Sequence, residues 1–293
     1  MFAGSIVALV TPFCVGRVDC SALEKLIEFH ISSGTDAILV CGSTGEGLLL
    51  SDAEREQIIA KSIEISNKRV PIIVGCSSCW TDDAIKLTSQ AEKLGADGVL
   101  LIAPYYVKPT QNGIIEHFKT VHNSTNIPII AYNNPGRCAV DMTVDTVQEI
   151  EKLPRVVGLK DSNTNLARVN LLKDKVSKLK LFSGDDPTLP GYLAHGGDGC
   201  ISVTANVFPR LVKQLLTSWQ NRDIENMQKT ANMLAPVSEA MFVEPNPIPV
   251  KYALSKMKLI ENELRLPLTM ASDKTKRHLD ILLASMLVQK RAS

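Results

Sequence analysis

Short apolar runs alternate with amphipathic stretches along most of the chain. Each run is three to five residues long and lacks the alternation of polar and apolar side chains that marks a strand with one wet face. Such runs predict strands that are buried on both faces, as in a parallel sheet. The eight runs are Ile6–Val10, Ala37–Val40, Val70–Val74, Val99–Ile102, Ile127–Ala131, Val156–Leu159, Lys180–Phe182 and Cys200–Val203.

Amphipathic helices are predicted between these strands. After the first run, Leu23 and Ile27 share one helical face and Gly34 follows as a C-cap. The same order of a glycine, an aspartate and then a strand recurs in three segments, GTDAILV, GADGVLL and GGDGCIS. Eight βα units favour a (β/α)8 barrel, a TIM barrel. A doubly wound sheet is the alternative, but no GxGxxG follows the first strand, which weakens it.

The strand pattern stops after about residue 207, and helical patterns continue to the C-terminus. The segment EPNPIP, residues 244–249, interrupts them because proline is excluded from helix interiors. We therefore predict a catalytic barrel over residues 1–224 and a helical C-terminal region over residues 225–293.

Composition and charge exclude several classes of protein. The chain has 293 residues, of which 45% are hydrophobic and 22% charged, as in an ordinary globular protein. The net charge of +1 gives no reason to expect nucleic acid or an acidic membrane as a partner. No apolar run approaches the roughly 20 residues of a membrane-spanning helix. The N-terminal MFAGSIVALVTPF lacks a basic region and is not interpreted as a signal peptide, so we expect a cytoplasmic location.

The cysteines and histidines do not indicate a disulfide framework or a metal site. Seven cysteines is an odd number in a long chain with a full core, which favours reduced thiols. Cys76 and Cys79 form a single CxxC without a second pair, and we expect small packing residues rather than a metal or redox site. His117 and His122 are five apart, not the four that place two ligands on one helix face.

Polar side chains follow the strands, at the end of a barrel where active sites lie. They form a set of hydroxyls, phenols, one guanidinium and one amine. By strand, they are Ser43 and Thr44 in CGSTGE, Tyr105 and Tyr106 in APYY, Tyr132 and Arg137 in AYNNPGR, and Lys160 after VVGL. Gly184, in SGDD, follows the next strand and is also a candidate site residue.

Lys160 ends a strand that has no wet face. It could be a structural lysine paired with Asp161 or another carboxylate. However, desolvation disfavours a charged ammonium group, and only the neutral amine attacks a carbonyl. Because tyrosines and hydroxyls follow the neighbouring strands, we favour Lys160 as a Schiff-base lysine over the structural role.

Two further groups fit this chemistry. Tyr132 can transfer protons if it is hydrogen-bonded to other hydroxyls, although it could also be a core tyrosine with a wet tip. GSTGE does not match the phosphate-binding pattern GxxxxGK[ST]. Its backbone amides, with Ser43 and Thr44, could hold a small carboxylate, or it could be only a tight turn.

These motifs together resemble one family. The ordered set GSIVALVTPF, GSTGE, PYYVKPTQ, YNNPGR, GLKDSN, SGDD, ISVTANV, FVEPNPIPVKYAL and LRLPLT runs nearly end to end. It is similar to the dihydrodipicolinate (4-hydroxy-tetrahydrodipicolinate) synthases, pyruvate-dependent class I aldolases whose superfamily includes N-acetylneuraminate lyase. The resemblance implies a TIM barrel with a helical C-terminal part and a homotetramer, a dimer of dimers. It implies a lyase of lysine biosynthesis that condenses pyruvate with L-aspartate 4-semialdehyde without a separate cofactor.

The resemblance also implies roles for individual residues. Lys160 would form the Schiff base with pyruvate, and Tyr132 would donate and accept protons. Ser43 and Tyr106 would complete a proton relay, with Tyr106 supplied by a neighbouring subunit. The remaining positions bind substrate: Thr44, the backbone of Ile201 and Gly184 around pyruvate, and Arg137 on the carboxylate of the semialdehyde, which suits a guanidinium fork.

The chain departs from the family pattern at two places. Ser43 stands where the family usually has threonine, a form common in N-acetylneuraminate lyases. Lysine-inhibited members often carry His, Asn and Glu in an interface pocket where this chain has Asp52, Arg55, Cys79 and Asp83, although Tyr105 remains. We therefore expect weak control by lysine.

Two alternatives to the synthase follow from these observations. Ser43 is compatible with a lyase for sialic acid or another keto-sugar acid, but the sialic acid lyases generally lack the guanidinium of Arg137. A catalytically silent protein that binds a keto acid would be marked by loss of Lys160, Tyr132 or Tyr106, and all three are present.

Overall fold

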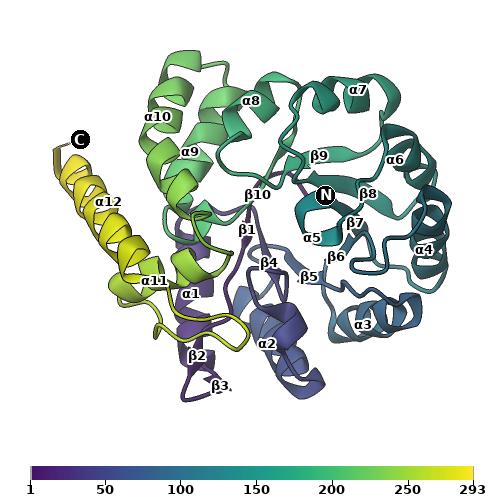
Figure 1. The fold of residues 1–293 in the computed structure, drawn as a ribbon, viewed down its shortest axis with the longest axis horizontal. Coiled ribbons are helices and arrows are strands. Elements are labelled where there is room, and N and C mark those ends of the chain that lie inside the picture. The colour runs from purple at the N-terminus through teal and green to yellow at the C-terminus, as the bar shows by residue number, and fades with distance from the viewer. Residues whose placement is uncertain (1, 293) are drawn as a thin grey trace.

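Eight parallel strands close into a barrel that is surrounded by helices (Figure 1). This computed structural model describes the backbone of residues 2–292 and the side chains of residues 2–286. Around the barrel the strands run β1–β10–β9–β8–β7–β6–β5–β4, and β1 closes against β4. The predicted TIM barrel is confirmed.

The eight predicted runs all form barrel strands, with small shifts at their ends. The observed bounds are β1 Gly4–Ala8, β4 Ala37–Val40, β5 Ile72–Gly75, β6 Gly98–Ile102, β7 Ile129–Asn133, β8 Val156–Asp161, β9 Lys180–Ser183 and β10 Gly199–Ser202. Strands β7 and β8 extend beyond the predicted runs at their C-terminal ends. There the ladder continues through the polar residues, since Tyr132 pairs with Lys160 and Asn133 with Asp161.

A short hairpin was not predicted. Strands β2 (Phe13–Cys14) and β3 (Arg17–Val18) pair antiparallel outside the barrel. Val15 and Gly16 at the turn both have positive φ angles, as this kind of tight hairpin requires. Two residues per strand are too few to produce a recognisable apolar pattern.

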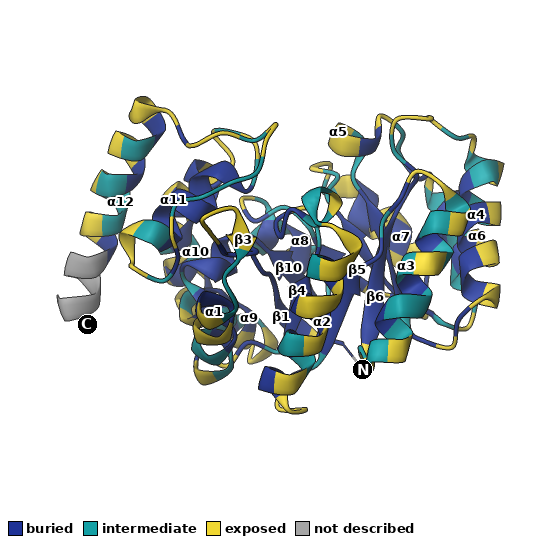
Figure 2. Cartoon of the chain, turned by 90° about the horizontal axis from the view of Figure 1, so that it is seen from below, coloured by how far each residue is buried: buried dark blue, intermediate teal, exposed yellow. Residues whose placement is uncertain are grey.

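Helices connect the strands and cover the outside of the barrel. They are α1 Cys20–Ser32, α2 Asp52–Ser66, α3 Thr81–Leu94, α4 Gln111–Asn123, α5 Pro135–Cys138, α6 Val144–Glu151, α7 Ala167–Lys175, α8 Leu189–Ala194 and α9 Pro209–Gln220, with short 3-10 turns η1 Gly47–Leu49 and η2 Thr204–Asn206. Figure 2 shows buried strands inside and helices whose outer faces are exposed. The core therefore lies within the barrel and between the barrel and the helices.

The C-terminal region is helical, as predicted. It contains α10 Ile224–Ala240, α11 Ile248–Lys256 and α12 Asp273–Ala292, which lie together at one side of the barrel (Figure 1). The interruption predicted at residues 244–249 is shorter, because Pro249 lies in the first turn of α11, where proline is tolerated. The division between residues 224 and 225 remains a prediction.

A buried ion pair joins this region to the loop after β4. Lys251 on α11 donates to Glu46, and neither side chain is exposed. The amide of Arg265 donates to the second oxygen of Glu46, at 3.0 Å. Removing one partner of such a pair leaves a buried charge, so this contact holds the GSTGE loop against the C-terminal region.

None of the described helices combines the length and the apolar run needed to cross a bilayer.

Candidate active site

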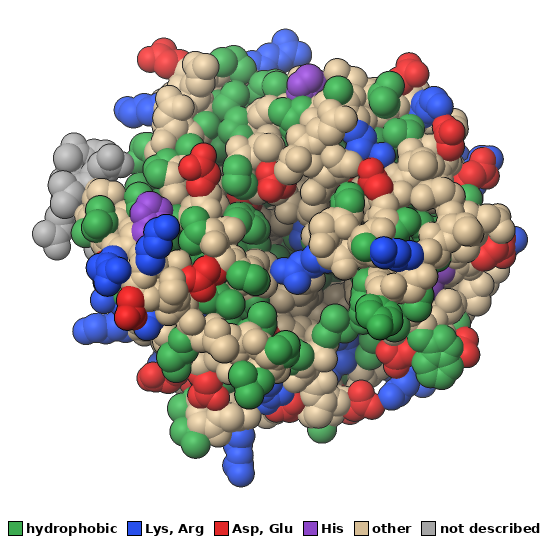
Figure 3. Space-filling model, in the orientation of Figure 1, with side chains coloured by type: hydrophobic (Ala, Val, Ile, Leu, Met, Phe, Trp, Pro, Cys, Tyr) green, Lys and Arg blue, Asp and Glu red, His purple; other side chains and the backbone are tan. Residues whose placement is uncertain are grey.

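A cavity of about 680 Å³ opens at the C-terminal ends of the strands. Figure 3 shows a hollow near the middle of this face, with basic side chains at its edge. Six of the predicted site residues line the cavity: Ser43, Thr44, Tyr132, Arg137, Lys160 and Gly184.

Lys160 lies on β8 inside this cavity and is 6% exposed. Its Nζ is 4.4 Å from the centre of the Tyr132 ring. The two side chains meet because Tyr132 and Lys160 are paired in register on neighbouring parallel strands, which directs both toward the barrel interior.

Asp161 is not the partner of Lys160. Its carboxylate accepts from Arg168 Nε at 2.8 Å and from Asn133 Nδ2 at 3.0 Å. Adjacent residues of a strand point to opposite sides, so Asp161 faces away from the cavity. Within the described residues no carboxylate lies at ion-pair distance from Lys160 Nζ. The structural role that the sequence left open therefore has no support in the contacts of Lys160.

The hydroxyl of Tyr132 receives two hydrogen bonds, from Asn134 Nδ2 at 2.7 Å and from Ser162 Oγ at 3.4 Å. Burial by itself raises the pKa of this phenol. The positive charge of Lys160, the two hydrogen bonds and the charge of Arg137 together outweigh burial, so the pKa of Tyr132 is lowered. The phenolate is thus easier to form here than in water.

Gly184 makes room for the lysine side chain. A Cβ at this position would lie 2.9 Å from Lys160 Cε and 3.1 Å from Cγ. It would lie closer still to Ser162 Oγ, so a larger residue would push on both side chains, and the glycine of SGDD shapes the cavity wall.

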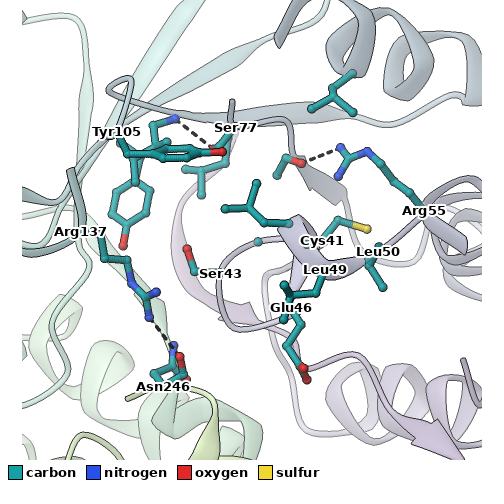
Figure 4. A pocket seen from close by; sticks show the side chains of 18 of the residues that line it. Cys41, Ser43, Glu46, Leu49, Leu50, Arg55, Ser77, Tyr105, Arg137 and Asn246 are labelled. Atoms are coloured by element: carbon teal, nitrogen blue, oxygen red, sulfur yellow. Dashed lines mark hydrogen bonds between the residues drawn. The ribbon is translucent and has the colours of Figure 1, made fainter. Parts of the chain in front are cut away.

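The loop after β4 and the C-terminal region meet at the cavity. Thr44 is buried, and its hydroxyl accepts a hydrogen bond from Asn246 Nδ2 at 2.9 Å. Arg137 Nη2 donates to the Asn246 carbonyl oxygen at 3.0 Å, and this guanidinium is exposed at the cavity edge. Figure 4 shows Arg137 and Asn246 on one side of Ser43.

A second cavity, of about 580 Å³, shares Ser43, Tyr132, Arg137 and Asn246 with the first. On the side of Ser43 away from Arg137 it extends toward Leu49 and Arg55 (Figure 4). The two cavities therefore adjoin at these residues.

This second cavity contains most of the residues that differ from the pattern of lysine-inhibited enzymes. Arg55 is buried and donates through Nη2 to the Gly75 carbonyl at 2.6 Å and to Cys76 Sγ at 3.4 Å. Asp52, Asp83 and Tyr105 also line it, whereas Cys79 does not. Burial raises the pKa of the Cys76 thiol to about 11, as expected of a packing residue. The same expectation is wrong for Cys79, which is exposed.

The comparisons with known proteins agree with this geometry. A family model described as the dihydrodipicolinate synthetase family matches residues 1–286. The chain belongs to this family. The curated 4-hydroxy-tetrahydrodipicolinate synthase of Thermodesulfovibrio yellowstonii is 46% identical over 286 residues, which cover 97% of this chain and 98% of that protein.

Solved structures support the same family. The dihydrodipicolinate synthase of Aquifex aeolicus is 41% identical with a TM-score of 0.95, covering 97% of this chain and 98% of that one. The chloride-inhibited dihydrodipicolinate synthase of Acinetobacter baumannii, complexed with pyruvate, has the same identity, TM-score and coverage. The family and its lyase activity, predicted from the sequence, are confirmed.

Two predicted site residues of this family member are not brought to the cavity within one chain. Tyr106 is 89% exposed, and Ile201 lies on β10 with 1% exposure; neither lines the cavity. From the end of β10 it is Val203 that lines it. The roles assigned to Tyr106 and Ile201 remain predictions.

Several residues of the site are not predicted from the sequence. Asn134 and Ser162 both contact Tyr132, and Asn246 contacts both Thr44 and Arg137. Asn134 and Ser162 lie within the quoted motifs YNNPGR and GLKDSN, so their positions after strands could have indicated them. In the sequence Asn246 is only part of a helix break, and its approach to the cavity depends on tertiary packing.

Within the described residues no group of three or more histidine, cysteine, aspartate or glutamate side chains is arranged to hold a metal ion. The seven cysteines are all free thiols.

Proposed function

We propose that this chain condenses pyruvate with L-aspartate 4-semialdehyde through a Schiff base on Lys160, the 4-hydroxy-tetrahydrodipicolinate synthase reaction of lysine biosynthesis. The observation that carries the proposal is the position of the amine. Lys160 lies in the cavity without a carboxylate partner among the described residues, 4.4 Å from the ring centre of a tyrosine that can transfer protons.

The first half of the reaction forms the nucleophile. The neutral amine of Lys160 attacks the keto carbon of pyruvate, and loss of water leaves an imine. Removal of a proton from the pyruvate methyl group then gives an enamine. Tyr132 shuttles protons in these steps, and two observations support this role: its ring lies beside the amine, and the pKa of its hydroxyl is lowered.

The second half forms the product. The enamine carbon bonds to the aldehyde carbon of the semialdehyde, whose oxygen takes a proton and becomes the hydroxyl. The amine of the semialdehyde then attacks the imine carbon, closes the ring and releases Lys160. No cofactor is required, because the protonated imine serves as the electron sink.

The other site residues bind and orient the substrates. Thr44 and the Ile201 backbone hold the pyruvate carboxylate, and Gly184 leaves space beside Lys160. Arg137, at the open edge, meets the carboxylate of the semialdehyde. Ser43, in the shared part of both cavities, connects Tyr132 to Tyr106 from a neighbouring subunit in a homotetramer. The enzyme acts in the cytoplasm on these two metabolites.

The test is a comparison of second substrates. The purified enzyme is supplied with pyruvate and either L-aspartate 4-semialdehyde or N-acetylmannosamine, the latter because Ser43 is compatible with a sialic acid lyase. We expect product only from the semialdehyde. Product from the sugar alone would contradict the proposal.

A chemical trap tests Lys160 directly. Borohydride added with pyruvate should reduce the imine and leave a three-carbon adduct on the peptide that contains Lys160. An adduct on another lysine, with Lys160 unmodified, would refute the assignment. Lys160→Arg keeps the charge, cannot form the imine, and should show no adduct.

A further inference from the structure

The side chain of Asn134 joins two parts of the active site. Asn134 follows β7 and precedes the short helix α5, which carries Arg137. Its Oδ1 accepts a hydrogen bond from the backbone amide of Arg137 at 3.1 Å, as an N-cap does. Its Nδ2 donates to Tyr132 Oη at 2.7 Å.

The contacts determine which way the amide of Asn134 is turned. The backbone N–H of Arg137 can only donate, so the atom that faces it must be the oxygen. The NH2 group therefore faces Tyr132, and the phenol oxygen accepts. The hydrogen bond from Asn134 to the phenol is then a consequence of the cap.

Asn134 makes the shorter of the two hydrogen bonds to the phenol of Tyr132. The hydroxyl of Ser162 lies 3.4 Å from Tyr132 Oη, and it also donates to the Gly184 carbonyl at 3.0 Å. A serine has one proton to donate, so the contact with Gly184 weakens its bond to Tyr132. The NH2 group of Asn134 has two protons to donate, so its bond to the phenol at 2.7 Å meets no such competition.

We propose that Asn134 is a positioning residue for proton transfer: its NH2 group orients Tyr132 and stabilises the phenolate, while its Oδ1 holds the helix that carries Arg137. The inference rests on the proposed role of Tyr132 as the proton shuttle. An accepted hydrogen bond leaves the proton of the phenol free to point into the cavity, toward the reacting atoms. It also strengthens as the oxygen becomes negative.

Two substitutions separate the donor from the cap. Asn134→Ser keeps a good N-cap but has no NH2 group that reaches the phenol. Asn134→Asp keeps both the size and the cap, but places a carboxylate against Tyr132 Oη and disfavours the phenolate further. Neither should change the midpoint of thermal unfolding by more than a few degrees. Ser162→Ala is the comparison, and because its bond is longer its effect should be smaller.

The first readout is the ionisation of Tyr132, followed by ultraviolet difference spectra at increasing pH without substrate. The same spectra of Tyr132→Phe identify the signal. We expect Asn134→Ser to raise the pKa of Tyr132 by about one unit, the size of a tenfold change in the ionisation equilibrium. Asn134→Asp should raise it more. An unchanged titration in both variants would overturn the inference.

The second readout is the pH profile of kcat/KM with pyruvate and L-aspartate 4-semialdehyde. The limb that reports loss of the phenol proton should move to higher pH in Asn134→Ser, with kcat/KM about tenfold lower near neutral pH. A higher KM for the semialdehyde with an unchanged profile would mean that Asn134 acts only through Arg137, and would also overturn it. If the wild type made no product, the proposed function would fail, while the titration would still decide whether Asn134 controls Tyr132.

Discussion

Arg137 lies at the boundary between the cavity and solvent. It is exposed on the four-residue helix α5, and its guanidinium is held by the Asn246 carbonyl at 3.0 Å. Lys160 lies deeper and is nearly buried. These two depths fit an order of binding in which pyruvate binds first, at Lys160, and the semialdehyde binds second, nearer to solvent.

Arg137→Ala should impair the second substrate more than the first. A hydrogen bond to a charged group contributes about 1.5–3 kcal/mol, so kcat/KM for the semialdehyde should fall roughly 10- to 150-fold. Formation of the borohydride adduct with pyruvate should persist. Arg137→Lys keeps the charge but not the planar fork of the guanidinium. Its kcat/KM for the semialdehyde should lie between those of the wild type and Arg137→Ala. Loss of the pyruvate adduct in Arg137→Ala would place this residue in the first half-reaction or in the scaffold.

At the scale of elements, two helices bury a histidine. His30 on α1 contacts Thr35 Oγ1 through Nδ1 at 3.1 Å, and His117 on α4 contacts Thr81 Oγ1 at 3.0 Å. In both rings Nε2 is buried without a partner among the described residues. Burial disfavours the imidazolium and lowers the pKa of His30 to about 3 and that of His117 to about 4.

These two histidines should make the protein less stable in acid. Their usual pKa is 6.5 in the unfolded chain, so below pH 6.5 the unfolded state binds protons that the folded state does not. The free energy of unfolding should then fall toward pH 4, by up to about 1.4 kcal/mol per pH unit for each histidine. Urea unfolding at several pH values measures this slope. His30→Leu should make this slope shallower. A slope equal to that of the wild type would contradict the lowered pKa of His30.

At the scale of the whole molecule, one face has exposed apolar side chains on the loops after three neighbouring strands. Leu48 follows β4, Trp80 follows β5, and Tyr106 and Val107 follow β6. Tyr106 also has a positive φ of 69°, an uncommon conformation for a bulky residue. Exposed apolar side chains on neighbouring loops are typical of a protein interface. In the proposed homotetramer a second copy of the chain would cover them.

Hybrid dimers test whether Tyr106 enters the partner's site. Lys160→Ala and Tyr106→Phe should each have low activity. In a two-fold dimer, mixing the two variants under conditions of subunit exchange makes about half of the dimers hybrid, each with one intact site, so activity should recover to about a quarter of the wild type. Activity equal to the average of the separate variants would show that Tyr106 acts within its own subunit or not at all.

Control by lysine would depend on the proposed assembly, because the effector pocket of lysine-inhibited members lies at an interface. L-lysine carries two ammonium groups and one carboxylate, and each must be paired, because an unpaired charge in a buried site costs several kcal/mol. Asp52 is already paired with Lys86 at 2.7 Å. Arg55 already donates hydrogen bonds to the Gly75 carbonyl and to Cys76 Sγ. Cys79 is exposed, and it stands in place of an amide side chain of the lysine-inhibited members. An amide both donates and accepts hydrogen bonds, and a thiol does both poorly.

We expect the enzyme to keep most of its activity at about 1 mM L-lysine, since a loss of about 3 kcal/mol weakens binding roughly 150-fold. A titration of initial rate against L-lysine measures this. Cys79→Asn should increase sensitivity if the missing amide is the cause. Saturable inhibition of the wild type well below 1 mM would show that Asp52, Arg55 and Asp83 form an effective site.

The barrel and most of its site were predictable from local patterns. All eight strands are located from short apolar runs, because a strand buried on both faces has few polar positions. The cavity residues Lys160, Tyr132, Arg137 and Gly184 were identified because strand ends meet at one face of a barrel. The predicted ends of the strands are less accurate. Tyr132 and Lys160 belong to β7 and β8 because they pair with each other across the sheet, and such pairing joins residues that are distant in the sequence.

The sequence by itself determined the fold and the choice of reactive groups, since strand periodicity and strand-end chemistry are properties of neighbouring residues. Only the tertiary structure decided their partners. It engaged Asp161 with Arg168 rather than Lys160, placed Asn246 between Thr44 and Arg137, and turned the amide of Asn134 toward Tyr132. These contacts join segments through packing, register and the direction of each hydrogen-bond donor, and such relations are absent from the local pattern of the chain.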